Sequence, residues 1–278
     1  MKKIFVAYAD QNMAYSLFRI GQQARALKIF DDVILYTPDD LPDYIKQSSL
    51  IKYSYGGGYW CWKPAIIHET LQKYEDGSVV CYVDAGCTLS EGVEWKLFFE
   101  LMKTYSVLCF HYPEIVPEWK RFGSCSTKIK YWTKKSALLF LDSVVGTQAY
   151  REQNKVMGGV LFFKGKSNSF LSEWLKITLN SPQIIIDPIG EEKSDQYDFF
   201  AQHKHDQSVI TALTYKFKDD VMVLPELFEG PEKDVAICAS RIRTCTRKDY
   251  VFFKLKQILR SLLGKSLTDK IKISIKKQ

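Results

Sequence analysis

The sequence predicts an α/β fold in which a mixed, mainly parallel sheet carries helices on both faces. Three observations lead to this prediction. Short runs of apolar, β-branched and aromatic residues alternate with helix-period patterns from the first residues onward. The run at 79–83 is apolar nearly throughout, as expected for a strand covered on both sides. With 278 residues, 46% of them hydrophobic, the chain is long enough to bury a full core.

The expected elements follow in chain order. Residues 3–9 form a strand, and the apolar spacing of Leu17, Ile20 and Ala24 predicts a helix after it. A strand at 33–36 precedes a short helix at 41–47, and a glycine-rich segment at 54–59 precedes a helix at 63–74. Residues 181–202 are expected to form a mobile loop. The remaining strands are expected at 79–83, 107–110, 156–163 and, last, 221–224, and the remaining helices at 94–103, 136–141, 170–179 and 206–215.

Composition excludes several classes of protein. The longest apolar run falls short of the ~20 residues that a membrane-spanning helix needs, and the opening residues meet Asp10 too early for a secretory signal. The seven cysteines are odd in number and contain no Cys-x-x-Cys pair, so we expect reduced thiols in a cytoplasmic protein. A disulfide framework and a cysteine-based zinc site are therefore not expected.

Charge divides the chain near residue 240. Residues 241–278 hold 12 Lys and Arg against two acidic residues, whereas residues 1–240 hold 27 basic against 30 acidic residues. We expect a catalytic domain over 1–240 and a basic tail over 241–278. Nucleic acid is not an expected partner, because the body is slightly acidic.

The tail has the spacing of a basic amphipathic helix, with apolar residues at Val251, Leu255, Ile258, Leu259 and Leu262. Such a helix either docks its apolar stripe on the body or lies on an anionic membrane surface through residues 250–278. We favour the membrane, which predicts a peripheral protein on the inner face of the plasma membrane.

The first candidate site follows the strand at 79–83. Asp84, with Ala85 and Gly86 after it, would lie at the carboxyl edge of the sheet, where α/β proteins bind ligands. A carboxylate there suits a divalent ion that bridges phosphate oxygens, and Gly86 would let the backbone approach a ligand. The alternative is that Asp84 only caps a turn.

A second candidate is the run from Tyr55 to Pro64, in which three glycines precede Trp60, Trp62 and Lys63. The tryptophan rings offer flat faces for a sugar or base, and Lys63 would be a mobile charge able to reach a diphosphate. The alternative is that the tryptophans belong to the core.

Three further motifs carry possible chemistry. Gly158 and Gly159 open an apolar run and suggest close backbone approach to a ligand, or a β-bulge. Asp206 precedes Gln207 at a helix start, where it either caps the helix or acts as a general base. Its neighbour His205 could complete a metal site. Lys134 either contacts a phosphate or acceptor, or is simply solvated.

The sequence lacks the motifs of P-loop nucleotide-binding proteins, α/β-hydrolases and dinucleotide-binding enzymes. The chain contains no P-loop and no Gly-x-Ser-x-Gly elbow, and Tyr8-Ala9-Asp10 follows the first strand where a dinucleotide-binding enzyme has its glycine motif.

The order of these motifs resembles that of bacterial glycosyltransferases of the GT-A fold, particularly those of capsule and O-antigen gene clusters. The resemblance rests on 82–86, 157–162 and 205–208, and the runs at 58–64 and 131–134 resemble signatures of one subgroup. The resemblance implies transfer of a sugar from a nucleotide-diphosphate donor, expected to be a UDP-sugar, to a lipid-linked surface-polysaccharide acceptor. It implies Asp84 and Asp206 as catalytic residues, with Asp206 as the base. The donor would be bound by Tyr8, Asp10, Trp60, Lys63, Asp84, Gly86, Lys134, Gly158, Gly159 and Gln207.

One departure from the family affects the cofactor. The usual Asp-x-Asp is Asp84-Ala85-Gly86 here, so the second acid is missing. Either Asp84 and His205 hold Mn²⁺ or Mg²⁺, or cations such as Lys63 neutralise the diphosphate without a metal; we favour the metal. The alternative function is that of a non-catalytic glycan-binding or scaffold protein of a polysaccharide assembly complex.

Overall fold

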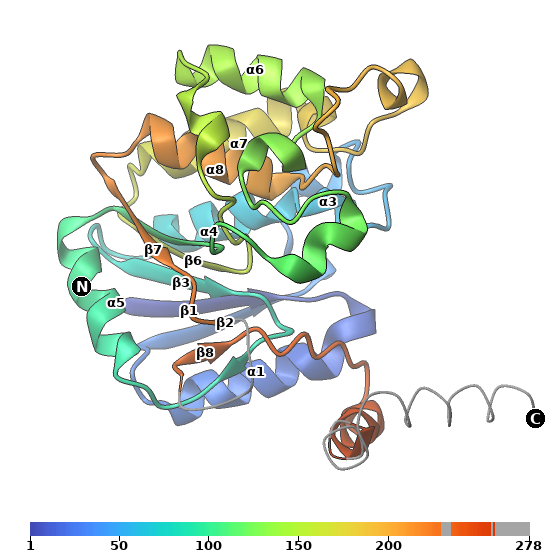
Figure 1. Cartoon of the computed structure of the whole chain (residues 1–278). Helices are drawn as coiled ribbons and strands as arrows, with labels where there is room; N and C mark the ends of the chain where they lie inside the picture. The colour runs from blue at the N-terminus through green and yellow to red at the C-terminus, as the bar shows by residue number, and fades with distance from the viewer. Residues whose placement is uncertain (229–234, 257, 259–278) are drawn as a thin grey trace, which may run out of the picture.

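A six-stranded sheet forms the centre of the computed structural model, which describes residues 1–228, 235–256 and 258 (Figure 1). Its strand order is β2-β1-β3-β6-β5-β7. Only β6 runs antiparallel to its neighbours in this sheet, so the expected mixed, mainly parallel sheet is confirmed. The strands are β1 (Lys3–Tyr8), β2 (Asp32–Tyr36), β3 (Val79–Val83), β5 (Val107–His111), β6 (Val160–Lys164) and β7 (Val221–Pro225).

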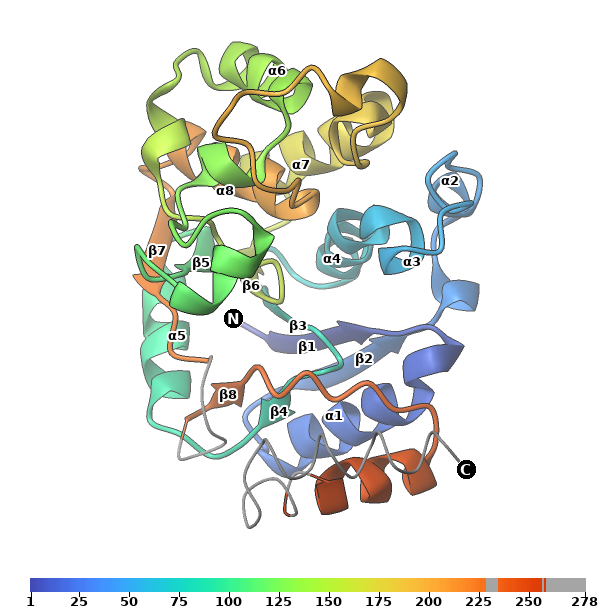
Figure 2. The same ribbon diagram turned by 45° about the vertical axis from the view of Figure 1, so that its right-hand side comes forward.

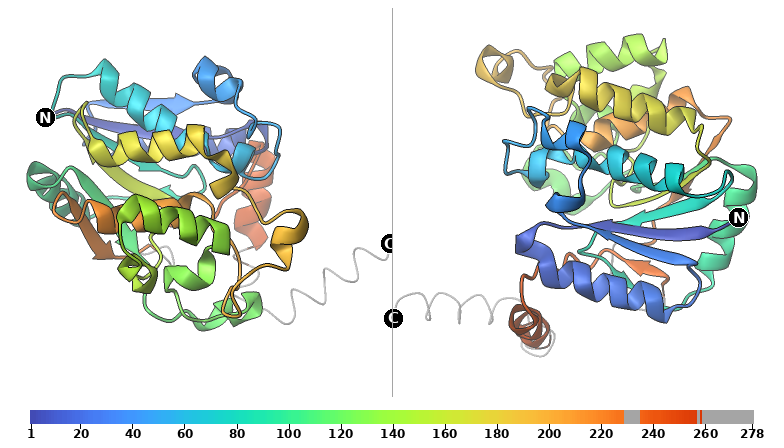
Figure 3. Two further views of the ribbon diagram at one scale, coloured as in Figure 1. Left: turned by 90° about the horizontal axis from the view of Figure 1, so that it is seen from above. Right: turned by 180° about the vertical axis from the view of Figure 1, so that it is seen from behind.

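Helices cover both faces of the sheet because both faces are apolar (Figure 3). Along β1, Phe5 and Ala7 face one side, whereas Ile4 and Val6 face the other, as the two-residue period of a strand requires. One face packs against α1 (Ala14–Ala26) and α5 (Glu94–Thr104). The other packs against α4 (Trp62–Lys73), α7 (Ser169–Asn180) and α8 (Asp206–Lys216), with α6 (Lys135–Val145) beside α8.

Short elements complete the described fold. A two-stranded antiparallel ribbon pairs β4 (Thr88–Leu89) with β8 (Ile237–Cys238) (Figure 2). The sequence-based expectation that 221–224 is the last strand is therefore wrong. The short helices are α2 (Asp43–Lys46) and α3 (Gly56–Tyr59). Short 3₁₀ helices lie at Gln11–Met13, Pro38–Asp40, Pro117–Phe122, Ile129–Trp132, Ala149–Glu152, Pro182–Ile184 and Gly190–Lys193.

The strand expected at 156–163 begins later than predicted, at Val160. Before it, Asn154 and Val156 make only isolated bridges, to Lys128 and His111. The chain then bends through Gly158 and Gly159 beside two carboxylates, as described below, and this bend ends the ladder.

The connections on either side of β1 place a crevice at its carboxyl end. The chain leaves β1 through α1 on one face to reach β2, and leaves β2 through α4 on the opposite face to reach β3. Because the two crossovers lie on opposite faces, the carboxyl ends of β1 and β3 form a topological switch point, the place where open α/β sheets bind ligands.

The basic tail begins with a helix over residues 247–256. Its start is a capping box: the amide of Asp249 donates to the Thr246 hydroxyl (3.2 Å), and the amide of Thr246 donates to the Asp249 carboxylate (2.8 Å). The expected amphipathic helix is thus present in this part, whereas Leu259 and Leu262 lie outside the described residues. Within the described ranges, none of the helices has the length and apolarity to span a bilayer.

Candidate functional site

A cavity of about 860 Å³ opens at the carboxyl ends of β1 and β3. Its size is that of a small-molecule site. The residues that line it combine carboxylates, arginines, aromatic rings and amides. They are Tyr8, Ala9, Asp10, Asn12, Met13, Ser54, Tyr55, Gly56, Gly57, Trp60, Trp62, Asp84, Ala85, Gly86, Cys87, Tyr112, Met157, Gly159, Val160, Gln207, Ala239, Arg241 and Arg243.

Asp84 is the acid that faces this cavity from β3. Its side chain is 43% exposed, and its Oδ1 accepts a hydrogen bond of 2.5 Å from the Tyr82 hydroxyl. The amide of Asp84 donates to the carbonyl of Gly159 (2.8 Å), which ties the strand end to the start of β6. Asp84 is therefore held in place and still accessible to a ligand.

Lys63 lies beneath Asp84 and is almost fully buried. Its Nζ donates to Oδ2 of Asp206 (2.9 Å) and to the carbonyl of Gly158 (2.8 Å), and it lies 3.7 Å from Oδ1 of Asp84. Burial alone would lower the pKa of Lys63, but the carboxylates of Asp206 and Asp84 outweigh burial and raise that pKa. Lys63 is thus a fixed ammonium that joins two carboxylates, not the mobile charge that the sequence suggested.

Gly158 and Gly159 make this cluster possible. A Cβ atom on Gly158 would lie 2.9 Å from Oδ2 of Asp206, and one on Gly159 would lie 2.8 Å from Oδ2 of Asp84. Real Cβ atoms do not approach other atoms so closely. The close approach expected at these glycines is therefore to the two carboxylates; a contact with a donor sugar stays a prediction.

Asp206, the expected base, lies behind the cavity wall and does not line the cavity. Its side chain is 7% exposed, and its second oxygen, Oδ1, accepts from the amide of Gln207 (2.9 Å). Gln207, by contrast, reaches the cavity. The arrangement suits Asp206 to hold Lys63, because both of its oxygens are already hydrogen-bonded.

Aromatic side chains form one wall. The rings of Tyr8 and Trp62 stack with centroids 3.9 Å apart, and Trp60 lines the same cavity. Burial, with a smaller contribution from Asp10, raises the pKa of Tyr8 to about 12, so its hydroxyl stays protonated. The alternative that Trp62 belongs to the core holds in part, because it is 4% exposed and still lines the cavity.

The glycine run shapes this wall through its backbone. All residues from Gly56 to Trp60 have positive φ, between 53° and 95°. L-residues pay for this left-handed conformation whereas glycine does not, which explains three consecutive glycines. The turn is closed by Trp62, whose Nε1 donates to the carbonyl of Gly56 (3.1 Å).

A segment that the sequence analysis did not assign to the site supplies its arginines. Residues 239–245, called the strap below, run from β8 along α1 toward the tail helix (Figure 2). Arg241 and Arg243 are exposed and line the cavity, whereas Ile242 and Thr244 between them are buried. The alternation of charged and uncharged residues in Arg-Ile-Arg-Thr was the available signal. The domain division expected at residue 240 stays a prediction, although the strap crosses it.

Of the predicted site residues, Lys63, Gly158 and Asp206 lie behind the cavity without lining it, and two others lie elsewhere. Lys134 is buried and its Nζ donates to Oε2 of Glu192 (3.0 Å), and it is not among the cavity residues. His205 is also outside that set: its Nδ1 donates to the carbonyl of Ile185 (2.9 Å), and its Nε2 lies 3.8 Å from Oδ1 of Asp187. Burial lowers the pKa of His205.

The residues present do not fit a protein-built divalent cation site. Among the described residues, His, Cys, Asp and Glu nowhere gather in threes as metal ligands would. Of the two acids joined by Lys63, only Asp84 faces the cavity, and the Lys63 ammonium already lies 3.7 Å from its Oδ1. The buried His205 points to Asp187 and not into the cavity. The metal site expected on Asp84 and His205 is therefore not assembled in this arrangement.

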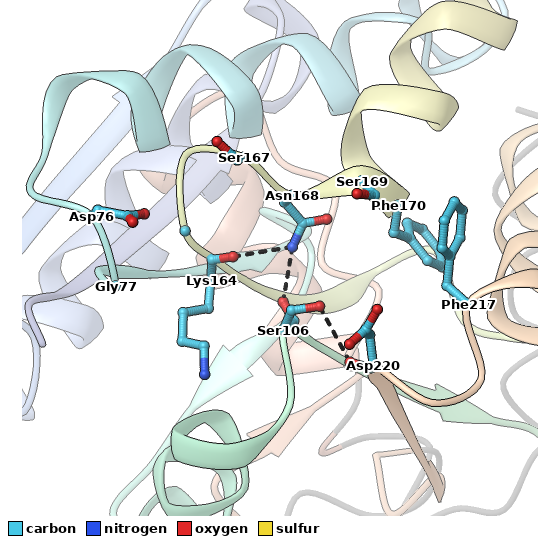
Figure 4. Close-up of a pocket in the computed structure, with 11 residues that line it drawn as sticks. Asp76, Gly77, Ser106, Lys164, Ser167, Asn168, Ser169, Phe170, Phe217 and Asp220 are labelled. Carbon is cyan, nitrogen blue, oxygen red and sulfur yellow. Dashed lines mark hydrogen bonds between the residues drawn. The ribbon is translucent and has the colours of Figure 1, made fainter.

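A second, smaller cavity of about 340 Å³ lies at the opposite edge of the sheet (Figure 4). There Asn168 donates to the carbonyls of Ser106 (3.0 Å) and Lys164 (3.1 Å) while its Oδ1 caps α7. These hydrogen bonds join neighbouring segments of the chain, so we assign Asn168 in this cavity a structural role.

Comparisons with known proteins give matches in structure alone. No family model and no curated protein matches the sequence. The chain is similar to a glycosyltransferase involved in the glycosylation of the major capsid of PBCV-1, with a TM-score of 0.47 and 9% identity over 90% of this chain and 98% of that one. It is also similar to mouse xyloside xylosyltransferase 1, with a TM-score of 0.42 and 10% identity over 81% and 85%.

A third similar structure is galactosyltransferase LgtC in complex with donor and acceptor sugar analogues. Its TM-score is 0.37, with 14% identity over 79% of this chain and 72% of that one. These three solved proteins are glycosyltransferases, and their likeness to this chain is distant. The function of this chain is therefore argued from its own cavity.

Proposed function

We propose that the chain is a glycosyltransferase that takes a sugar from a nucleoside-diphosphate donor, with uridine as the expected base. One observation carries the proposal: a cavity at the switch point of the sheet brings together an accessible carboxylate, two arginines and stacked aromatic rings. This set matches the parts of such a donor, since rings stack on a base, cations bind phosphates and a carboxylate accepts from sugar hydroxyls.

The reaction breaks the bond between the anomeric carbon and the diphosphate oxygen, which keeps the bonding electron pair, and forms a bond between that carbon and the oxygen of an acceptor hydroxyl. The hydroxyl proton passes to the departing diphosphate or to water. Negative charge grows on the leaving diphosphate, so fixed positive charge beside it lowers the barrier. Of the two acids joined by Lys63, Asp84 is the one that lines the cavity, and we assign to it the contact with the donor sugar. Asp206 fixes Lys63 beneath Asp84 and acts as a positioning residue.

The test of this proposal is calorimetric titration of the full chain with a panel of nucleosides, nucleoside diphosphates and nucleotide-sugars, with and without Mn²⁺. We expect a nucleoside diphosphate to bind and its sugar to be slowly hydrolysed or transferred. If none of the panel binds under either condition, the proposal is wrong. Sugar binding without hydrolysis or transfer would instead favour the scaffold function.

Asp84→Asn gives the matching prediction for catalysis. Loss of this carboxylate should lower turnover about 100-fold or more, in the range found for a lost electrostatic contact in other enzymes. The free energy of unfolding should change by about 1 kcal/mol or less, because Lys63 keeps Asp206 as its partner. Asp219→Asn, on an exposed residue outside the cavity, is the control. A large loss of stability with unchanged turnover would assign Asp84 to turn capping.

We further propose a lipid-linked surface-polysaccharide acceptor, and a protein bound at the inner face of the plasma membrane. The support is the helix at 247–256 and its flank, where Val251, Phe252, Leu255 and Ile258 are exposed, Phe252 by 75%. Arg247 and Lys248 adjoin this apolar face, and basic residues beside apolar ones are typical of helices that lie on anionic lipid.

Vesicle flotation tests this placement in the full chain. Replacing Phe252 and Leu255 together by Asp should abolish flotation with anionic vesicles. Leu97→Asp, at a leucine of α5 that is exposed to the same degree (51% against 52% for Leu255), should leave flotation unchanged. Equal flotation of both variants would contradict the proposed membrane contact.

A further inference from the structure

We propose that Arg241 and Arg243 of the strap bind the donor diphosphate and supply, in place of a metal ion, the positive charge that neutralises it. This inference rests on the proposed function and extends it to the means of neutralising the donor.

The strap is fixed to the body by its backbone. The amide of Ile242 donates to the carbonyl of Gly86 (2.9 Å), and the Ser16 hydroxyl donates to the carbonyl of Ile242 (2.9 Å). The amide of Thr244 donates to the Ser16 hydroxyl (2.9 Å), and the amide of Ser16 donates to the carbonyl of Thr244 (3.2 Å). These bonds satisfy polar groups of the first turn of α1 and set the register of the strap.

That register decides where the arginines lie. Ile242 and Thr244 are buried against the body, whereas Arg241 and Arg243, which alternate with them, are exposed and line the cavity. Arg241 has φ of 54°, a conformation that costs a residue with a side chain about 1–2 kcal/mol. Such backbone strain is typical of functional sites.

The strap also packs against the position of the missing acid. In Asp84-Ala85-Gly86, Gly86 takes the position of the second aspartate, and a Cβ there would lie 3.4 Å from the carbonyl oxygen of Ile242 and 3.6 Å from Cα of Arg241. Both distances are ordinary van der Waals contacts, so the strap backbone packs directly against this position. Where the motif has its second acid, this chain therefore has a glycine that lies against a segment carrying two cations.

The charges of the donor phosphates and of the two arginines are consistent with arginines acting in place of a metal ion. Each phosphate of a nucleoside-diphosphate sugar carries a negative charge, and a guanidinium binds phosphate through two parallel hydrogen bonds. Lys63 cannot bind the diphosphate in this way, since its side chain is buried and hydrogen-bonded to Asp206 and to the carbonyl of Gly158. Arg241 and Arg243 supply two guanidinium groups to the same cavity as Asp84.

The experiment titrates the full chain with a nucleoside diphosphate and with the parent nucleoside, in EDTA and in millimolar Mn²⁺. The wild-type chain should bind the diphosphate with the same affinity in both. Arg241→Gln and Arg243→Gln should each weaken diphosphate binding about tenfold and leave nucleoside binding unchanged, because a charged hydrogen bond contributes about this much. Arg241→Lys should recover part of the loss, and Arg25→Gln, at an exposed residue of α1 outside the cavity, should have no effect.

The outcomes separate this inference from the proposed function. Diphosphate binding that requires Mn²⁺, or that is unaltered in the double Arg→Gln variant, overturns the role of the arginines while leaving a nucleotide site in place. Equal weakening of nucleoside and diphosphate binding would reduce the strap to a structural part and also overturn it. If the wild-type chain binds no nucleotide at all, the proposed function itself fails.

Discussion

The buried ammonium of Lys63 fixes the floor of the cavity. It holds the carboxylate of Asp206 at 2.9 Å and lies 3.7 Å from that of Asp84, although these residues come from three different segments of the chain. Gly158 and Gly159 leave room for both acids. The site therefore depends on a contact between residues 143 positions apart in sequence.

Lys63→Met is predicted to destabilise the protein by about 3–5 kcal/mol, because the almost fully buried Asp206 loses its counter-charge. The double variant Lys63→Met/Asp206→Asn should recover most of this loss, since no unpaired charge then remains between the two. Urea unfolding of both variants measures the difference.

The control for the Lys63 variants is Lys176→Met. Lys176 pairs with Glu173 at 3.7 Å on the surface and is 67% exposed, so its loss should cost less than about 1 kcal/mol. Equal, small costs for Lys63→Met and Lys176→Met would contradict the buried cluster.

The sequence located several single residues of the cavity but not their partners. Strand ends in an α/β sheet are predictable, and this places Tyr8, Asp10, Asp84 and Gly86 at one edge. The state of Lys63 was not predictable, because its burial and its bond to Asp206 arise only when α4 and α8 pack on the same face. Lys134 was misplaced for the same reason: its partner Glu192 lies in a connecting segment.

At the scale of elements, the left-handed turn at Gly56–Trp60 carries the aromatic wall. A Cβ on Gly57 would make only ordinary contacts, at 3.4 Å from Nε1 of Trp62 and 3.7 Å from the Tyr8 hydroxyl. Any cost of a side chain there comes from the backbone, whose φ is +58°. The glycine is thus needed for its conformation and not for space.

Gly57→Ala is predicted to destabilise the protein by about 1–2 kcal/mol and to weaken nucleotide binding as the turn shifts. Gly77→Ala provides a matched control: its φ is +84°, and its Cβ would meet nothing within 4 Å, but it lies at the far edge of the sheet. It should lose similar stability and keep full nucleotide binding. If both variants bind nucleotide equally well, the turn at Gly56–Trp60 does not contribute to nucleotide binding.

Element types were predictable where periodicity was long enough. The period-2 and helix-period patterns identify the strands of the main sheet and the longer helices, because burial of one or both faces dictates them. β8 was missed because two residues give no period, and the start of β6 was placed too early because Val156 is as apolar as a strand residue. The strap from residue 241 onward was assigned to the tail, because the basic charge of residues 241–278 was given more weight than the short alternation of charged and uncharged residues at 241–244.

At the scale of the whole molecule, two features meet at one place. Crossovers on opposite faces open the crevice between β1 and β3, and the strap returns to this crevice from beyond β8. The tail helix follows the strap directly. A donor site and the proposed membrane contact are therefore adjacent along the chain, which suits an enzyme whose acceptor is carried on a lipid.

A crystal structure of the full chain with a bound nucleoside diphosphate, grown without divalent cations, tests this account most directly. We predict the base against the Tyr8–Trp62 wall, the diphosphate within hydrogen-bond distance of the Arg241 and Arg243 guanidinium groups, and Asp84 facing the position of the donor sugar. A nucleotide bound away from this cavity, with Asp84 turned from it, would contradict the account.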